Sequence, residues 1–274
     1  MNSPTEYISL IVPSRARAKR LREMLSSVET TISGKYRIEV IIVLDSDDQQ
    51  DYPRENLTDI ECTYIVGAPG RPMGVLNMTA VRAAKGNTIF LCNDDVRFET
   101  NGWDQIVMSE VRRFDDDLYL IYPNDGIKRK RLATFPILSR NLLLNNADLL
   151  PSSYKGSFID LHIMDVFMEL KQGYGIVYLD NVMCRHLHFS EDSNLFDSTY
   201  GKRNRFGDDS RFLEYSKRRK VLAGFLEKVP IKPIAFESSI VGLLYGRSTL
   251  TWRLRLFVYM FTRTFYRKIF VSES

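Results

Sequence analysis

Short apolar runs alternate with amphipathic stretches over the first hundred residues. Four of these runs have the length and β-branched content of strands: Tyr7–Val12, Ile38–Leu44, Cys62–Val66 and Thr88–Cys92. Helical spacing of apolar residues follows the first run, from Leu21 to Val28, and a further helix is predicted near Gly74–Lys85, after a Gly/Pro-rich turn. This alternation of strand and helix predicts an α/β fold with a mostly parallel sheet and crossover helices.

The pattern is less regular beyond residue 115. The predicted strands there are Leu118–Tyr122, Ala133–Leu138, Ile176–Leu179 and Val182–Phe189, and the predicted helices are Asp160–Gln172 and Asp208–Glu227. Two prolines within Val229–Pro233 interrupt any helix and predict a linker. We therefore expect one domain over residues 1–228, with halves at about 1–100 and 101–228, and a separate segment over 229–274.

That C-terminal segment has an apolar stripe at helical spacing. The stripe consists of Leu254, Val258, Phe261, Phe265 and Ile269. On a helix the opposite side carries Arg253, Arg263, Arg267 and Lys268, and the aromatic residues at the borders are Trp252, Tyr259, Tyr266 and Phe270. Such a helix is typical of segments that lie in a membrane interface. The alternative is a helix that packs on the body of the protein or in a dimer.

Charge is distributed unevenly along the 274 residues. The chain is 44% hydrophobic and 26% charged, an ordinary globular composition, and its net charge is +4. Six cations and no acid lie between Ser238 and Val271, which leaves residues 1–237 at about −1. The basic helix favours an anionic membrane surface over nucleic acid as a partner.

Three cysteines are too few and too scattered for a disulfide framework, which favours a reducing compartment. The N-terminus lacks the apolar core of a signal peptide, and no uncharged stretch approaches the ~20 residues of a spanning helix. We therefore expect a peripheral protein on the cytoplasmic side of a membrane.

Acidic residues follow two of the predicted strands. Asp45, Asp47 and Asp48 come after the second strand, and Asn93-Asp94-Asp95 comes after the fourth. Ligands of parallel sheets bind beyond the carboxyl ends of the strands, where both clusters would lie. A solvated turn is the alternative for the first cluster.

These features, in this order, resemble the GT-A-fold glycosyltransferases of family 2, over about Ile8–Phe189. The resemblance implies that Pro13, Ser14 and Arg15 border the nucleotide and that Asp45 contacts its base. The resemblance also assigns Asn77 to the donor site, and it places Asn93, Asp94 and Asp95 at the DxD-type metal site. Asn93 stands where many relatives have an acid, so the metal would be held by Asp94 or Asp95, and Asn93 would accept a hydrogen bond from the ribose.

The same resemblance concerns the histidines. The chain has only His162, His186 and His188, and the last two share one face of a predicted strand. The resemblance implies that His188, or else His186, meets the metal or the diphosphate, whereas His162 is structural or faces the acceptor. A half-buried histidine pair is the alternative. Oxygen ligands suit Mg²⁺ or Mn²⁺, and an added imidazole favours Mn²⁺.

Two carboxylates compete for the role of general base toward the acceptor hydroxyl. Asp160 and Asp165 lie in Phe158–Val166, which is similar to the family segment that holds this carboxylate. Asp165 matches the pattern better and is preferred, and an inverting reaction is the family's default. A carboxylate that stabilises a helix N-terminus is the alternative for either residue.

Several cations are further candidates for contact with the diphosphate. They are Arg71, in the turn Gly70–Gly74, and Lys202, Arg203 and Arg205, in the loop Gly201–Gly207. A solvated run of charge is the alternative for each of them.

The predicted function is a metal-dependent glycosyltransferase of polysaccharide biosynthesis. It would move a sugar from a nucleotide-diphosphate donor to a glycan or lipid-linked acceptor at the cytoplasmic membrane face. One alternative is a sugar-nucleotide nucleotidylyltransferase, although its Gly-rich loop should follow the first strand, where Ser14–Arg17 stands instead of Gly67–Gly74. The other is a peripheral membrane adaptor without catalysis.

Overall fold

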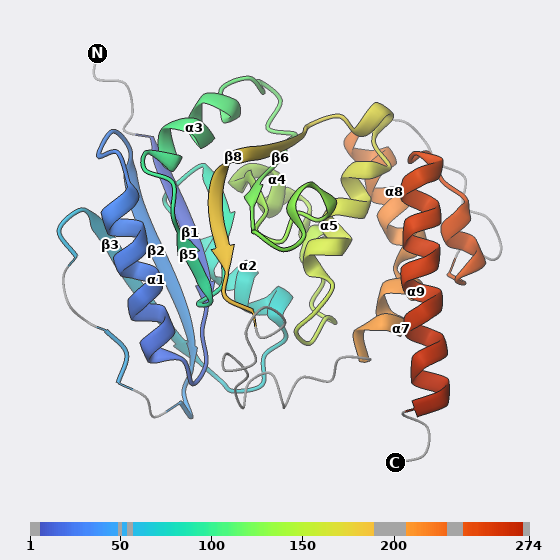
Figure 1. Cartoon of the computed structure of the whole chain (residues 1–274), viewed down its shortest axis with the longest axis horizontal. Coiled ribbons are helices and arrows are strands. Elements are labelled where there is room, and N and C mark those ends of the chain that lie inside the picture. The colour runs from blue at the N-terminus through green and yellow to red at the C-terminus, as the bar shows by residue number, and fades with distance from the viewer. Residues whose placement is uncertain (1–5, 49–50, 54–56, 189–206, 229–237, 271–274) are drawn as a thin grey trace.

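A single sheet organises the described part of the molecule. The computed structural model describes residues 6–48, 51–53, 57–188, 207–228 and 238–270. Within them, eight strands lie in the order β3-β2-β1-β4-β7-β6-β8-β5 (Figure 1). Their bounds are β1 (Tyr7–Pro13), β2 (Arg37–Asp45), β3 (Ile60–Gly67), β4 (Thr88–Leu91), β5 (Val96–Phe98), β6 (Leu120–Asn124), β7 (Ile137–Ser139) and β8 (Ile176–His186).

The first four strands of that order are parallel, as the sequence predicts. β1 pairs with β2 and β4, and β2 pairs with β3. The central residues of β2 are buried, because helices cover both faces of this half of the sheet. β7 joins the sheet antiparallel to β4 and β6, whereas β6 and β8 run parallel. The architecture is the expected α/β fold with a mostly parallel sheet.

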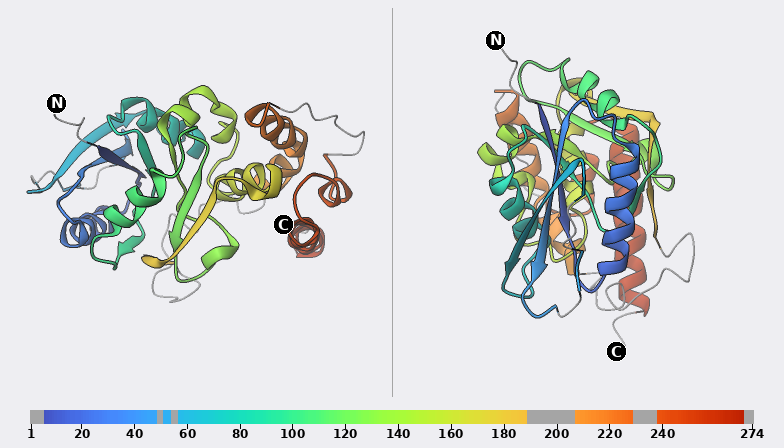
Figure 2. Two further views of the ribbon diagram at one scale, coloured as in Figure 1. Left: turned by 90° about the horizontal axis from the view of Figure 1, so that it is seen from above. Right: turned by 90° about the vertical axis from the view of Figure 1, so that its left-hand side faces the viewer.

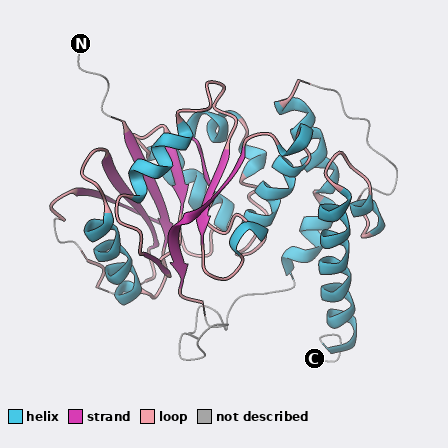
Figure 3. Ribbon diagram, turned by 45° about the horizontal axis from the view of Figure 1, so that its top comes forward, coloured by secondary structure: helices cyan, strands magenta, loops and turns pink. Residues whose placement is uncertain are grey.

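The helices form a layer on each face of the sheet (Figure 3). α1 (Ala18–Thr31) and α3 (Trp103–Val111) pack on one face, where Trp103 is fully buried. α2 (Met73–Ala83), α4 (Arg140–Asn145) and α5 (Ile159–Met168) pack on the other face. The carboxyl ends of β1, β2 and β4 are left uncovered between these layers, where a ligand can reach them.

The sequence pattern was less reliable in the second half. Ile176–Leu179 and Val182–His186 form one strand rather than two, and Phe189 lies outside the described residues. β5 and α3 were not predicted. β5 pairs antiparallel with β8, so that Val96 lies opposite His186. This pairing brings the histidine strand beside Asp94 and Asp95.

The C-terminal helices pack against α5 rather than standing apart from the body. They are α7 (Gly207–Glu214), α8 (Ser216–Leu226) and α9 (Leu250–Phe270). The view from above in Figure 2 shows α9 on the side of the molecule away from β3. Trp252, Leu256 and Met260 of α9 are buried in the same core cluster as α5. A domain boundary near residue 228 stays a prediction, as does the linker at 229–233, which lies outside the described residues.

None of the helices in the described part of the chain combines the length and hydropathy needed to cross a bilayer.

Candidate active site

A crevice runs along the carboxyl ends of β1, β2 and β4. We call it the strand-end crevice; its volume is about 570 Å³. The residues predicted to contact a nucleotide that line it are Pro13, Ser14, Arg15, Asp45, Arg71, Asn93 and Asp94. The structure therefore gathers the motifs of three separate strands into one site.

Asp45 is held between two arginines in this crevice. Arg15 Nη1 donates to Asp45 Oδ2 at 2.6 Å, and the same guanidinium forms two hydrogen bonds with Asp47. Arg71 Nη2 lies 3.6 Å from Asp45 Oδ1 and donates to the carbonyl of Leu44. These contacts raise the pKa of Arg15, because both carboxylates stabilise its charge. The crevice wall thus carries two guanidinium groups, and each lies beside a carboxylate of the same wall.

Arg17 occupies the bottom of the crevice and was not singled out from the sequence. Its Nη1 donates to Asp94 Oδ1 at 3.0 Å and to Asp95 Oδ2 at 3.2 Å. Asp94 Oδ2 accepts from the Ser14 hydroxyl at 2.7 Å. Burial and the neighbouring Asp95 charge raise the pKa of Asp94 to about 6, against the opposing effect of Arg17. Both oxygens of Asp94 are therefore already bound within the protein.

Asp95 lies beside His186, the last residue of β8, and His188, which follows the strand. Its Oδ1 is 3.5 Å from His186 Nε2, and the rings of His186 and His188 have centroids 5.1 Å apart. Two ligand atoms of one ion with bonds of about 2.1 Å can lie as far apart as Asp95 Oδ1 and His186 Nε2, so this pair fits a divalent cation. Over the described ranges no group of three or more His, Cys, Asp and Glu side chains is placed to hold a metal. The protein would thus contribute few ligands, and a bound diphosphate would have to complete the coordination.

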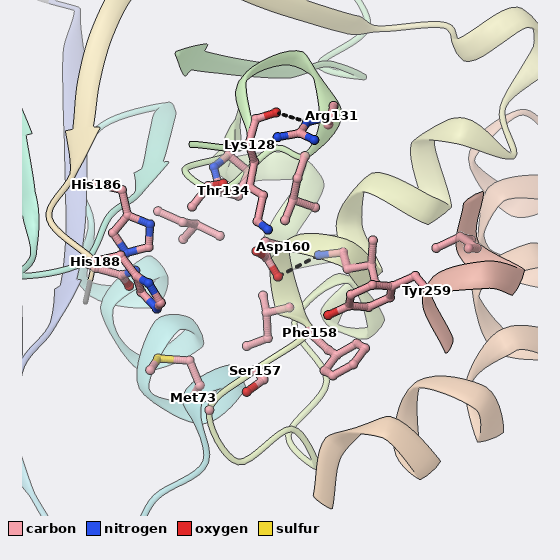
Figure 4. A pocket seen from close by; sticks show the side chains of 18 of the residues that line it. Met73, Lys128, Arg131, Thr134, Ser157, Phe158, Asp160, His186, His188 and Tyr259 are labelled. Carbon is pink, nitrogen blue, oxygen red and sulfur yellow. Dashed lines mark hydrogen bonds between the residues drawn. The ribbon is translucent and has the colours of Figure 1, made fainter. Parts of the chain in front are cut away.

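A second, central pocket of about 600 Å³ adjoins the crevice at Met73, Asn93 and Gly156. It lies between the sheet and the helices α5 and α9 (Figure 4). Asp160, His186 and His188 line it. So does Asn77, which the sequence assigned to the donor site but which lines this pocket rather than the crevice.

Asp160 is the carboxylate that faces the central pocket. It stands in the first turn of α5, where its Oδ1 accepts from the Leu161 N–H at 2.8 Å. Figure 4 shows it between Lys128 and Tyr259. Burial raises its pKa, whereas this hydrogen bond and the charges of His186 and Lys128 act in the opposite direction. Asp160 therefore combines access to the pocket with raised basicity.

Asp165 has a structural position, which corrects the preference for it as the base. Its Oδ2 accepts from Arg219 Nε at 2.6 Å, and its Oδ1 accepts from Trp252 Nε1 at 2.8 Å. Arg219 is fully buried and donates to the Phe212 carbonyl. Asp165 thus joins α5, α8 and α9, and it lines neither cavity. Trp252 is 4% exposed, which corrects its predicted place at a lipid boundary.

His162 is buried and lines neither cavity, and its structural or acceptor-facing role stays a prediction. Its Nδ1 is 3.0 Å from the Tyr154 hydroxyl and its Nε2 is 2.9 Å from the Asp148 carbonyl. Burial holds its pKa well below the usual value. Lys202, Arg203 and Arg205 lie outside the described residues, so their role stays a prediction.

Comparison with known proteins agrees with this fold. The family model described as glycosyl transferase family 2 matches residues 9–148. The chain is similar in structure to S. aureus TarS 1–349 in complex with UDP-GlcNAc (14% identity, TM-score 0.50, covering 96% of this chain and 74% of that chain). It is also similar to the mannosyltransferase PcManGT from Pyrobaculum calidifontis in complex with GDP-Man and Mn²⁺ (16% identity, TM-score 0.53, covering 93% and 74%). No curated protein sequence matches the chain significantly. The family match spans half of the chain, the fold agrees with it, and the chain therefore belongs to glycosyl transferase family 2, a GT-A-fold glycosyltransferase.

Proposed function

We propose that the strand-end crevice binds a nucleotide-diphosphate sugar and that Asp160 activates the acceptor hydroxyl in the central pocket. The observation that carries this proposal is the junction of the two cavities at Asn93, Met73 and Gly156. A donor with its nucleotide in the crevice would present its sugar at this junction. The named complexes of TarS with UDP-GlcNAc and of PcManGT with GDP-Man support such a donor.

The nucleotide would lie against Ser14, Arg15 and Asp45, with its diphosphate near Arg17. Guanidinium groups bind phosphate oxygens in a fixed, forked geometry and keep their charge at every physiological pH. Arg71 adds a second guanidinium to the same wall. These residues would orient the donor and stabilise the negative charge that develops on the leaving diphosphate.

Asp160 would accept the proton of the acceptor hydroxyl as its oxygen attacks the anomeric carbon. The new oxygen–carbon bond forms on the face opposite the diphosphate, the bond to the phosphate oxygen breaks, and the configuration inverts. A carboxylate is an adequate base at hydrogen-bond distance from the hydroxyl. Asp160 is the carboxylate that lines this pocket in the described structure, so this step is assigned to it.

A divalent cation, Mn²⁺ or Mg²⁺, would be held by Asp95 and His186 together with the diphosphate of the donor, and it would supply positive charge to the leaving diphosphate. Asp94, a predicted ligand, is left out because Ser14 and Arg17 bind both of its oxygens, whereas Arg17 binds Oδ2 of Asp95 and Oδ1 of Asp95 faces His186. His188 is left out because, in the described ranges, it does not complete a group of three ligands. Asp94 would instead hold Arg17 in place. The Mn²⁺ in the PcManGT complex supports a metal of this kind.

We expect nucleotide sugars of one base to raise the melting temperature, and Mn²⁺ to increase that shift. A ligand at a hundredfold excess over its Kd stabilises the folded state by about 2.7 kcal/mol. Thermal-shift assays with UDP, GDP, CMP and dTDP sugars, with Mn²⁺ or EDTA, measure this effect. His186→Ala should remove the increment due to Mn²⁺, whereas Arg97→Ala, an exposed neighbour outside both cavities, should keep it. An Mn²⁺ effect that survives His186→Ala would contradict the metal assignment.

We also propose that α9 lies on a membrane surface, where the acceptor would be found. Four residues of its predicted stripe are exposed, although the same helix packs on the body through its other face. The exposed fractions are 47% for Leu254, 57% for Val258, 51% for Phe261 and 58% for Phe265. Contiguous exposed apolar side chains on a helix favour contact with lipid or protein.

The cations contribute less to this surface than their sequence positions suggest. Arg263 pairs with Asp209 at 2.8 Å, and Arg253 donates to the carbonyl of Leu244. Both side chains therefore bind the body of the protein. Apolar burial, rather than attraction to anionic lipid, would supply most of the binding free energy.

Phe261→Glu combined with Phe265→Glu is expected to abolish sedimentation with liposomes and to leave the melting temperature within a few degrees. Each substitution places a charge on the exposed stripe without touching the core. Point variants are preferable to truncation, because removal of the tail would also remove Trp252, Leu256 and Met260 from the core. Val66→Glu, an exposed apolar site on β3, is the control. If the double variant sedimented with liposomes to the same extent as the Val66→Glu control, the membrane proposal would be refuted.

The two alternative functions lose their support. The family match and the fold are those of a glycosyltransferase, neither of a nucleotidylyltransferase nor of an adaptor without catalysis.

A further inference from the structure

Three cations surround the acceptor side of the central pocket. Lys128 and Arg131 reach it from the turn after β6, and Arg255 reaches it from α9. Asp160 is the acid among the described residues that line the pocket. Arg263, a fourth cation there, is paired with Asp209. The pocket therefore has a surplus of positive charge on the side away from the strand-end crevice.

Hydrogen bonds to the buried side chain of Asp125 hold the turn that carries two of these cations. Oδ1 of buried Asp125 accepts from the N–H groups of Ile127, Lys128 and Arg129 at 3.0, 2.7 and 2.7 Å. Its Oδ2 accepts from the Thr134 hydroxyl at 2.7 Å. Arg129, at the start of the 3-10 turn, has φ +51°, a conformation rare for residues with a side chain. The fold thus fixes a run of four cations, Lys128–Arg131, at the edge of the pocket.

The side chains of Arg131 and Lys128 have defined directions in this turn (Figure 4). Arg131 donates from Nε to the Lys128 carbonyl at 3.2 Å and from Nη2 to the Ile127 carbonyl at 2.9 Å. Figure 4 shows the Lys128 side chain extending from the turn toward Asp160. The turn therefore sets the position of the Arg131 guanidinium, and Lys128 points into the pocket beside it (Figure 4), which prepares both for a ligand.

Arg131 and Arg255 bring like charges together here, whereas Lys128 extends toward the carboxylate of Asp160 (Figure 4). In the described part of the chain, no carboxylate forms an ion pair with Lys128, Arg131 or Arg255. Burial and the charge of Arg131 lower the pKa of Arg255. Repulsion of this kind destabilises the free protein, and a bound anion would relieve it.

We propose that Lys128, Arg131 and Arg255 bind a phosphate group of the acceptor, beside the hydroxyl that Asp160 deprotonates. The acceptor would thus be a phosphorylated glycan or polyol and not a neutral sugar. This inference rests on the proposed function, because the pocket belongs to the acceptor only if Asp160 is the base. The diphosphate of the donor has its own guanidinium groups, Arg15, Arg17 and Arg71, in the strand-end crevice.

Phosphate fits the cluster better than a carboxylate does. A forked guanidinium forms paired hydrogen bonds with phosphate oxygens, and the cluster offers two guanidiniums and one ammonium. A phosphodiester presents oxygens on several sides, which cations from two separate elements can reach together. A carboxylate carries the same single charge as a phosphodiester, but it is smaller and its two oxygens lie in one plane.

The test uses direct binding, without turnover. The full-length protein is titrated with an oligo(glycerol phosphate), with glucuronate and with glycerol. We expect the oligo(glycerol phosphate) to bind and the other two to bind at least about tenfold more weakly. Lys128→Ala combined with Arg131→Ala should weaken the first ligand about tenfold or more. The matched control, Arg129→Ala with Lys130→Ala, removes the same charge from the same turn but from residues outside the pocket.

Equal losses in the two double variants would show non-specific attraction and overturn the proposal. Equal affinity for glucuronate would overturn the choice of phosphate. A third measurement uses vesicles with and without phosphatidylglycerol. If only the pocket variant lost vesicle binding, the cluster would bind a lipid headgroup, and the proposal of an acceptor phosphate would be overturned. Donor-nucleotide affinity, measured on the same variants, should stay unchanged. A protein that binds oligo(glycerol phosphate) but no nucleotide would refute the proposed function and leave the anion site standing.

Discussion

Replacing Asp160 with asparagine is expected to lower kcat by about 10²–10⁴-fold and to leave the affinity for the donor unchanged. Asparagine has the same shape and can still accept the hydrogen bond from the Leu161 N–H, so the start of α5 should stay intact. It cannot take a proton from the acceptor. Release of nucleoside diphosphate in the presence of acceptor measures the rate, and thermal shift with the donor measures binding.

Asp148→Asn is the matched control for this prediction. Asp148 is exposed, lies outside both cavities, and loses the same charge on substitution. Its variant should turn over at the rate of the unmodified protein. If Asp160→Asn kept its turnover, or if it lost donor binding to the same degree, Asp160 would not be the base.

Asp165→Ala is expected to reduce the free energy of unfolding by about 3–5 kcal/mol, the second large effect. The substitution leaves Arg219 buried without its carboxylate and the Trp252 indole N–H without its acceptor. Three helices lose their common contact at once. Denaturant unfolding measures the loss, and the donor should still bind below the new melting temperature.

A surface ion pair provides the comparison for that variant. Glu61 pairs with Lys85, and both side chains are about half exposed, so Glu61→Ala should cost about 0–1 kcal/mol. Asp165 would be the base after all if Asp165→Ala lost as little free energy of unfolding as Glu61→Ala, still bound the donor and no longer transferred the sugar.

The first half of the fold was predictable because its strands are local and continuous in apolar residues. A continuous apolar run such as Ile38–Leu44 is buried on both of its faces only in the middle of a sheet that helices cover on both sides. Pairing of β5 with β8 is different, because it joins residues about 90 positions apart and β5 has only three residues. No local pattern encodes such a contact, so the approach of His186 to Asp95 required the structure.

The choice between Asp160 and Asp165 shows the same limit at the site. Five positions on a helix correspond to about 140° of rotation, so the sequence predicts that only one carboxylate faces the pocket. It does not say which, because that depends on where α8 and α9 pack. Arg219 and Trp252 bind Asp165 from more than fifty positions away in the sequence, and Asp160 is left facing the pocket. Arg17 was missed for a related reason: its partners follow a different strand.

A crystal structure with the stabilising nucleoside diphosphate and Mn²⁺ tests the central claim most directly. The account predicts the nucleotide along Ser14, Arg15 and Asp45, with anomalous density for Mn²⁺ at Asp95 and His186. The free end of the diphosphate should point past Asn93 toward Asp160. A nucleotide bound elsewhere, or with its diphosphate directed away from the central pocket, would contradict the account.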